Sequence, residues 1–327
     1  MTGNMKIGNR TFTFGKKVYI MGILNVTPDS FSDGGKFDTL EHAMAQVEKM
    51  IEEGADLIDV GGESTRPGHQ QITEDEEIAR VVPVIQKIKE KYDIPVSIDT
   101  YKSRVAEAAL EAGADMLNDI WGFLYDEKMA ELAVRYDVPV CLMHNRNNTE
   151  YQDFVPDVVA DLKKCLAVAE KYGVKKENIM LDPGVGFGKT YEQNLAIINH
   201  LEVLCDMGYP VLLATSRKSV IGLTLDLPVT EREEGTIATS VIGAMKGCDF
   251  VRSLASVNKV NCDIAISTNG GYPLDQNIDR SDYVWKREGR INGSDSDKRF
   301  RVLLPSRSIK RRKCAGTEVF SVRDDVL

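Results

Sequence analysis

Short apolar runs that end in, or contain, a polar residue recur eight times along the first 252 residues of the chain. Seven of the eight runs are followed by a stretch with apolar residues at helical spacing, which predicts parallel strands connected by helices. The runs and their polar residues are Val18–Leu24 with Asn25, Leu57–Val60 with Asp59, Val96–Ile98 with Asp99, Met116–Leu117 with Asn118 and Asp119, Val140–Met143 with His144, Ile179–Leu181 with Asp182, Val211–Leu213 with Thr215 to Lys218, and Phe250–Val251 with Arg252.

The same periodicity predicts the helices between these runs. Thr73 with Glu76, and Thr230 with Glu233, form patterns typical of a helix capping box. Eight regular units without a long connection favour a closed (β/α)8 TIM barrel over an open doubly wound sheet. The helices are expected at residues 39–53, 73–91, 102–112, 127–136, 155–172, 191–207 and 230–246.

The C-terminal part of the chain follows a different pattern. The eighth strand should be followed by an eighth helix, but the only candidate, residues 257–266, is interrupted by polar residues. Beyond it lie Gly, Ser and Asp-rich stretches and the basic run 310–313, which predict irregular or disordered chain. We therefore divide the chain into a barrel at residues 1–252 and an atypical tail at 253–327, with the eighth helix degenerate or missing.

Composition narrows the class of protein. Hydrophobic residues make up 43% of the chain, enough for a sizeable core, and the net charge of −9 argues against a general nucleic-acid binder. No apolar run is long enough to span a bilayer, and the N-terminus lacks the apolar core of a signal peptide. The six scattered cysteines form no C-x-x-C pair, which predicts reduced thiols and a cytoplasmic protein.

Because the C-terminal ends of barrel strands meet at one mouth, the polar residues there form a candidate active site. Asp99 and Asp182 would be costly as lone buried charges, so they should bind a ligand with several N–H donors. Lys218, hydroxyls of the segment 215–219 and Arg252 would form a positive corner suited to phosphate. Taken alone, the loops at 22–35 and 61–68 also fit ordinary surface turns.

Two motifs are set aside. The segment 184–190 resembles a phosphate-binding P-loop, but its spacing is one residue short and Pro183 occupies the first glycine position. His144 lies close to Cys141, but the other histidines are on predicted helices or a loop, so a structural or polar-contact role is favoured over zinc binding.

Together, the motifs make residues 15–252 similar to the bacterial dihydropteroate synthase family, the target of sulfonamides. The resemblance implies a barrel that joins 6-hydroxymethyl-7,8-dihydropterin diphosphate to p-aminobenzoate, releasing diphosphate and forming 7,8-dihydropteroate in folate biosynthesis. The motifs, in order, are Gly22–Gly35, Glu63–Gly68, Ser97–Thr100, Asn118-Asp119, Leu142–Arg146, Asp182–Gly184, Thr215–Ser219 and Phe250–Arg252.

The resemblance also implies roles for single residues and for a metal ion. Asn25 would bind Mg²⁺ through the diphosphate, and Arg252 would hold diphosphate oxygens. Asp99, Asp182, Lys218 and Arg252 would be the catalytic residues. Pterin would be bound by Asp99, Asn118, Asp182, Phe187 and Lys218, and p-aminobenzoate by Phe31, Asp33, Thr65, Arg66 and Ser219. The substrates are small molecules, neither nucleic acid nor membrane is a partner, and members of the family are usually homodimers.

The chain departs from the family at its eighth strand. The family reads Arg-Val-His, whereas this chain reads Arg252-Ser253-Leu254, so a histidine that contacts diphosphate is absent. DNA able to encode residues 306–320 can, read one base later, spell His-Gly-Val-Leu-Lys-Glu-Glu-Asn-Val-Leu-Gly-Gln-Arg-Phe, which resembles dihydroneopterin aldolase, another folate enzyme. We favour the hypothesis of a frameshift near codon 252 over a genuinely adapted tail.

Two alternatives remain open at this stage. One is a pterin-binding barrel that is non-catalytic or crippled, which the missing histidine and closing helix favour. The other is an enzyme like the methyltetrahydrofolate corrinoid methyltransferases. The segments 63–68 and 215–219 argue against the latter, because a methyl donor brings no diphosphate.

Overall fold

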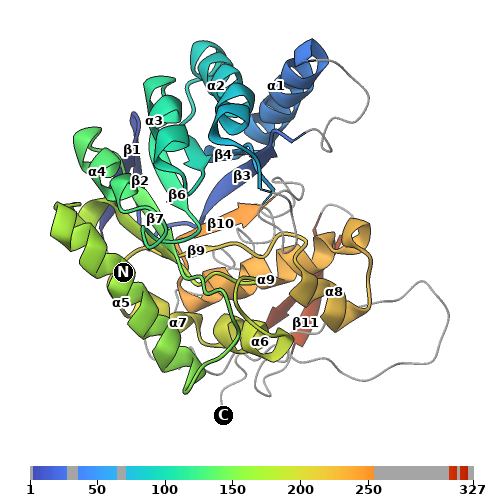
Figure 1. The fold of residues 1–327 in the computed structure, drawn as a ribbon. Helices are drawn as coiled ribbons and strands as arrows, with labels where there is room; N and C mark the ends of the chain where they lie inside the picture. The colour runs from blue at the N-terminus through green and yellow to red at the C-terminus, as the bar shows by residue number, and fades with distance from the viewer. Residues whose placement is uncertain (1–2, 28–35, 65–70, 254–308, 315–316, 323–327) are drawn as a thin grey trace.

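In the computed structural model, described residues cover 3–27, 36–64, 71–253, 309–314 and 317–322. Eight parallel strands form one sheet in the order β8-β7-β6-β5-β4-β3-β10-β9, and a bridge between Leu181 and Val211 joins its two ends. The predicted (β/α)8 barrel is therefore confirmed (Figure 1). The strands are β3 (Tyr19–Asn25), β4 (Leu57–Gly61), β5 (Val96–Asp99), β6 (Met116–Asp119), β7 (Val140–Met143), β8 (Ile179–Asp182), β9 (Leu212–Leu213) and β10 (Phe250–Ser253).

Helices follow the strands and cover the outside of the barrel. Thr73 caps its helix as the sequence predicts, since its hydroxyl accepts from the Glu76 backbone N–H and the Glu76 carboxylate accepts from the Thr73 N–H. The helices are α1 (Lys36–Glu52), α2 (Glu74–Lys91), α3 (Ser103–Glu111), α4 (Lys128–Arg135), α5 (Phe154–Tyr172), α6 (Tyr191–Asn199), α7 (Leu201–Cys205), α8 (Ser219–Leu225) and α9 (Glu233–Lys246).

Two of the helix predictions were wrong in detail. The single helix expected at 191–207 is two helices, because His200 leaves the helical conformation at φ −118° and ψ 29°. The capping box expected at Thr230 does not form: residues Val229–Glu231 make a 3-10 turn, and α9 begins after Arg232 without a side-chain cap. The Arg232 guanidinium instead donates to the carbonyls of Leu227 and Arg217, so a tertiary contact sets this helix start.

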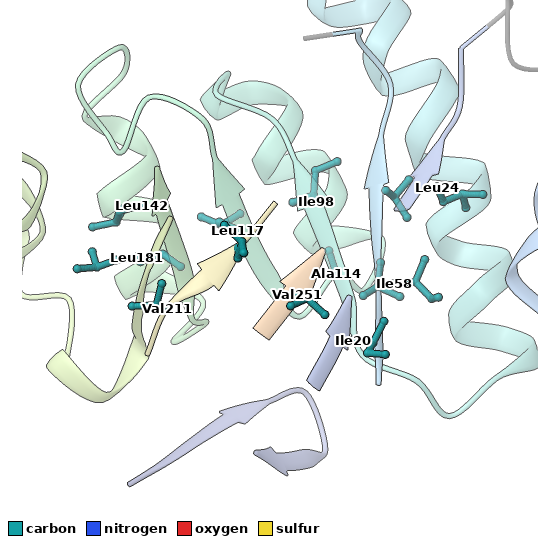
Figure 2. Packing of buried hydrophobic residues seen from close by; sticks show 14 of the residues in the cluster. Ile20, Leu24, Ile58, Ile98, Ala114, Leu117, Leu142, Leu181, Val211 and Val251 are labelled. Atoms are coloured by element: carbon teal, nitrogen blue, oxygen red, sulfur yellow. The ribbon is translucent and has the colours of Figure 1, made fainter. Parts of the chain in front are cut away.

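Alternate residues of each strand face opposite sides of the barrel wall. The outward side chains pack against the helices in one continuous cluster, which includes Ile20, Ile58, Ile98 and Val251 (Figure 2). Burying these β-branched and leucine side chains on both faces explains why the strands read as nearly continuous apolar runs.

The inward side chains change from apolar to polar along the barrel axis. Near the strand starts they form a second cluster with Met21, Leu57, Met116 and Phe250. A hairpin that the sequence pattern did not predict, β1 (Asn4–Ile7) with β2 (Arg10–Thr13), adds Met5, Ile7, Phe12 and Phe14 to that cluster. Its Phe12 ring lies 5.5 Å from the Phe250 ring. The hairpin covers the N-terminal end, and the polar inward residues lie toward the opposite mouth.

In the tail, the structure describes one more hairpin, β11 (Ile309–Cys314) paired antiparallel with β12 (Thr317–Val322). The weak helix expected at 257–266 and the rest of the tail apart from this hairpin lie outside the described residues, and so do Phe31, Asp33, Thr65 and Arg66. The division into barrel and tail and the frameshift hypothesis therefore stay predictions. No described helix is long and apolar enough to cross a membrane.

Candidate active site

Arg252 connects three strands at the barrel mouth. Its guanidinium Nε donates to Asp59 Oδ2 at 2.6 Å, and its Nη2 donates to Asp99 Oδ2 at 2.5 Å. Asn118 Nδ2 donates to the same Asp59 oxygen at 3.1 Å. The strands β10, β4, β5 and β6 all end at this mouth. Side chains that are far apart in the sequence, from Asp59 to Arg252, therefore meet in one buried polar group.

This polar group contains two unsatisfied acceptors. Asp59 Oδ1 and Asp99 Oδ1 are buried and have no hydrogen-bond partner among the described residues. A buried carboxylate oxygen without a donor costs free energy, so such atoms occur where a ligand supplies the donor. Burial raises the pKa of Asp99 to about 7, although the neighbouring Arg252 charge acts in the opposite direction.

Asp182 and Lys218 lie at the other side of the same mouth. Burial raises the pKa of Asp182, while the positive charge of Lys218 lowers it. Burial lowers the pKa of Lys218 to about 8, opposed by the carboxylates of Asp182 and Asp99. Lys218 and these two carboxylates therefore influence one another's charge at the C-terminal end of the barrel.

The segment between β8 and α6 holds Lys218 in place. The Lys218 ammonium donates to the Val185 carbonyl at 2.5 Å and lies 4.8 Å from the centre of the Phe187 ring. A cation over an aromatic face is electrostatically stabilised. Asp182 Oδ1 accepts from the Gly184 N–H at 2.6 Å, which fixes the start of the same segment.

The segment after β9 is pinned from outside by α9. Thr215 and Thr239 share a hydroxyl hydrogen bond of 2.7 Å, and the Arg217 N–H donates to the Thr236 hydroxyl at 3.0 Å. The hydroxyl of Thr215, expected in the positive corner, is therefore engaged by a helix in the substrate-free protein. Ser219, the first residue of α8, is exposed.

Apolar side chains form a wall beside the polar group. Tyr101, Ile120 and Met143 are buried together, and the partly exposed rings of Trp121 and Phe187 pack against them. Such a wall fits the face of a flat ring, while the carboxylates fit its polar edge. The sequence analysis missed Ile120 and Met143, because an apolar residue at a strand end gives no signal distinct from core packing.

Asp59 is among the polar strand residues that the sequence places in the candidate active site, but no role was predicted for it. Its side chain is fully buried and directly contacts Arg252 and Asn118. The signal in the sequence is a charged residue within an apolar strand. Asp59 lies two residues before Gly61, and Gly61 pairs with Asp99 in the sheet.

A buried ionic group flanks the segment 65–70. Lys102 Nζ donates to Glu63 at 2.6 Å, to Glu77 at 2.8 Å and to the Ile72 carbonyl at 3.0 Å. Tyr101 donates to the other Glu63 oxygen at 2.9 Å. Lys102 therefore ties the residues on both sides of this segment to the rim of the mouth.

The site offers little to a resident metal ion. Among the described residues, no group of three or more His, Cys, Asp or Glu side chains is arranged to hold one. Asn25, at the end of β3, is a single partly exposed amide. One amide oxygen fits an ion that arrives with substrate phosphates, since Mg²⁺ commonly keeps several water ligands and binds few protein groups.

A closed barrel with buried carboxylates, a lysine and an arginine at its mouth defines a small-molecule enzyme of the TIM-barrel class. The sequence model of the family described as "Pterin binding enzyme" matches residues 21–253. The chain belongs to this family. A model of the lactate racemase C-terminal domain also matches a short stretch, residues 257–283.

Relatives and solved structures similar to this chain carry one name, dihydropteroate synthase. Dihydropteroate synthase from Clostridium beijerinckii is 64% identical over 249 residues, covering 76% of this chain and 93% of the relative. The Bacillus subtilis dihydropteroate synthase is 54% identical over 240 residues, covering 73% of this chain and 84% of the relative.

Two solved structures extend the comparison. The Clostridium difficile dihydropteroate synthase with pteroic acid is 50% identical with a TM-score of 0.77, and the match covers 79% of this chain and 98% of that one. The Xanthomonas albilineans dihydropteroate synthase with 4-aminobenzoic acid is 37% identical with a TM-score of 0.78, covering 84% of this chain and 100% of that one.

Proposed function

We propose that this protein is a dihydropteroate synthase, a transferase that condenses 6-hydroxymethyl-7,8-dihydropterin diphosphate with p-aminobenzoate to give 7,8-dihydropteroate and diphosphate. The observation that carries the proposal is the pair of buried, unsatisfied carboxylate oxygens on Asp59 and Asp99. A dihydropterin edge is rich in N–H donors, so it would satisfy these acceptors and remove their desolvation cost.

The remaining residues follow from this placement of the ring. Asp99, Asp182, Asn118 and Lys218 would bind the polar edge of the pterin, with Phe187 beside its face. Arg252 would bind diphosphate oxygens and stabilise the charge that develops on them. We retain Phe31, Asp33, Thr65, Arg66 and Ser219 as the proposed p-aminobenzoate side, on the strength of the family resemblance.

The reaction requires charge stabilisation and no strong base. The bond between the pterin methylene carbon and the diphosphate oxygen breaks, and its electron pair leaves with diphosphate. The lone pair of the neutral aromatic amine forms the new C–N bond, and the amine proton passes to water. Asn25 would hold Mg²⁺ through the diphosphate, and this ion would supply further positive charge to the leaving group.

Turnover with both substrates and Mg²⁺ tests the proposal. We expect diphosphate and dihydropteroate to appear in equal amounts. Pterin binding without diphosphate release would favour the non-catalytic barrel instead, and methyl transfer from methyltetrahydrofolate would favour the methyltransferase. We also propose that the protein is located in the cytoplasm, which cell fractionation tests. Light scattering tests whether this chain, which lacks a recognisable eighth helix, forms the homodimer usual in the family.

A further inference from the structure

Lys189 is a buried lysine between β8 and α6, and the function proposed above gives it no role. Its Nζ donates to the carbonyls of Gly184 at 2.9 Å and Phe187 at 3.0 Å, and lies 2.7 Å from His144 Nδ1. These three partners are neutral. Burial lowers the pKa of Lys189 to about 7, opposed by the Asp182 carboxylate, and the three acceptors around Nζ match the three N–H donors of an ammonium. Burying this group is expensive, so its presence here calls for a function.

The segment that Lys189 binds is the one that holds Lys218. Lys189 binds the carbonyls of Gly184 and Phe187, at the two ends of the stretch 184–187. Within this stretch, the Val185 carbonyl accepts from Lys218. The Phe187 ring also lies against the Lys218 ammonium. Lys189 therefore acts on Lys218 through one short stretch of backbone, without touching the substrate side of the mouth.

The glycines of this segment allow it to pack directly on the segment after β7. A Cβ atom on Gly184 would lie 1.9 Å from the His144 carbonyl oxygen, and one on Gly188 would lie 2.5 Å from the Arg146 carbonyl oxygen. Both glycines have positive φ, at 65° and 53°. The resemblance to a P-loop thus reflects tight backbone packing around a lysine that faces inward.

His144 connects the buried ammonium to an acidic residue. Its Nε2 lies 3.3 Å from Asp161 Oδ2, and Asp161 also binds Arg146 at 2.5 Å and Lys164 at 2.7 Å. Burial lowers the pKa of His144 to about 3, so the ring is neutral at pH 7. Because the Lys189 ammonium donates to Nδ1, the single proton of the neutral His144 ring lies on Nε2. The Nε2–H then points toward the Asp161 carboxylate, so both contacts of the ring are attractive.

We propose that Lys189 is a positioning residue: its ammonium, oriented by His144 and Asp161, fixes residues 184–187 so that Val185 and Phe187 hold Lys218 in the geometry that binds the pterin. This inference rests on the proposed function for its kinetic consequence only. Whether Lys189 orders the backbone of residues 184–187 can be measured by hydrogen exchange in the protein without any substrate.

The test is Lys189→Met, which keeps the length of the side chain and removes its charge. Loss of three hydrogen bonds from a charged donor should raise the KM for the pterin diphosphate about tenfold and leave the KM for p-aminobenzoate within about twofold. Amide hydrogen exchange in residues 183–190 should become about tenfold faster, because the carbonyls that order the segment lose their donor.

Lys246→Met is the matched control. Lys246 is also a fully buried lysine, and its ammonium donates to the Asn199 carbonyl at 2.8 Å and to Glu202 at 3.1 Å. It lies in the last turn of α9, toward the barrel end opposite the mouth. This variant should lower the thermal midpoint but change neither KM nor the exchange of residues 183–190.

His144→Phe provides a second variant should Lys189→Met fold poorly. It keeps a ring of similar size but removes the Nδ1 acceptor, so we expect a rise of about threefold in the pterin KM. Equal changes in both KM values, or unchanged exchange at 183–190 in both variants, would overturn the proposal. If the wild type makes no dihydropteroate, the proposed function fails, and the exchange measurement still decides the role of Lys189.

Discussion

Arg252 and Asp99 form an ion pair of 2.5 Å between Nη2 and Oδ2, although 153 positions separate them in the chain. Asp59 binds the same guanidinium, so two carboxyl groups occupy Arg252 in the substrate-free protein. A diphosphate approaching Arg252 therefore competes with both carboxylates. The Oδ1 atoms of Asp59 and Asp99 stay available to a pterin, because Arg252 occupies only their Oδ2 atoms.

Lys218→Ala and Asp182→Ala should each abolish pterin binding. Lys218→Ala removes the partly buried cation of the mouth, and Asp182→Ala removes a buried acceptor whose charge that cation offsets. Each change should weaken binding by about 2–4 kcal/mol, or roughly 30- to 1000-fold. Titration calorimetry with a pterin measures this, and Lys175→Met, at an exposed lysine paired with Asp137, is the control. Retained affinity in either site variant contradicts the site.

Arg66→Ala should act mainly on p-aminobenzoate. The family resemblance places this arginine on the side of the aromatic acid, where a guanidinium binds a carboxylate in two places. We expect the KM for p-aminobenzoate to rise about tenfold while the KM for the pterin diphosphate stays within about twofold. Initial-rate measurements with each substrate varied in turn decide this, and an unchanged KM for p-aminobenzoate removes Arg66 from the proposed site.

The stability of the substrate-free protein should depend on pH through Asp99 and Lys218. The folded pKa of Asp99, about 7, lies above its ordinary value of 3.8, so the folded state binds more protons and stability falls as pH rises through that window. The folded pKa of Lys218, about 8, lies below 10.5, so stability rises with pH above about 8.

Urea unfolding across pH 4 to 10 measures these two contributions as differences between wild type and variant. Asp99→Asn should flatten the fall between about pH 4 and pH 7, and Lys218→Met should flatten the rise above about pH 8. Each difference should amount to about 1–3 kcal/mol across its window. Parallel pH curves for wild type and variants would show that burial does not shift these two groups.

Gly184→Ala should destabilise the protein far more than Gly173→Ala. Both residues have positive φ, at 65° and 84°, so both changes carry a backbone cost of about 1–2 kcal/mol. A Cβ at position 184 would also meet the His144 carbonyl oxygen, whereas one at position 173 meets nothing within 4 Å. We expect an additional loss of about 2 kcal/mol or more for Gly184→Ala by urea unfolding. Equal losses would refute the close packing.

Restoring the family pattern after Arg252 should raise activity. If the tail arises from a frameshift, a chain with the family's histidine two residues after Arg252 and its own eighth helix should have a higher kcat/KM than this chain, by about tenfold or more. Sequencing the gene across codon 252 is the direct check. An unaltered frame, together with full activity of this chain, would favour an adapted tail.

The order of strands and helices follows from local pattern, because alternation of apolar runs with helical periodicity is set by neighbouring residues. This is why the barrel, the start of α2 at Thr73 and the gathering of Asp99, Asp182, Lys218 and Arg252 at one mouth could be predicted. Parallel strands that close into a barrel bring their C-terminal ends together whatever the side chains are.

Contacts between distant segments decided the rest. The charged Asp59 in an apolar run is visible in the sequence, but its contact with Arg252, 193 positions away, is set only by the fold. The start of α9 moved from Thr230 to Glu233 because Arg232 binds carbonyls of another segment. Lys189 has its three partners because the segment 184–188 packs closely on residues 144–146. Hydrogen bonds and buried charges are energies between atoms in space, so residues far apart in the chain determine them.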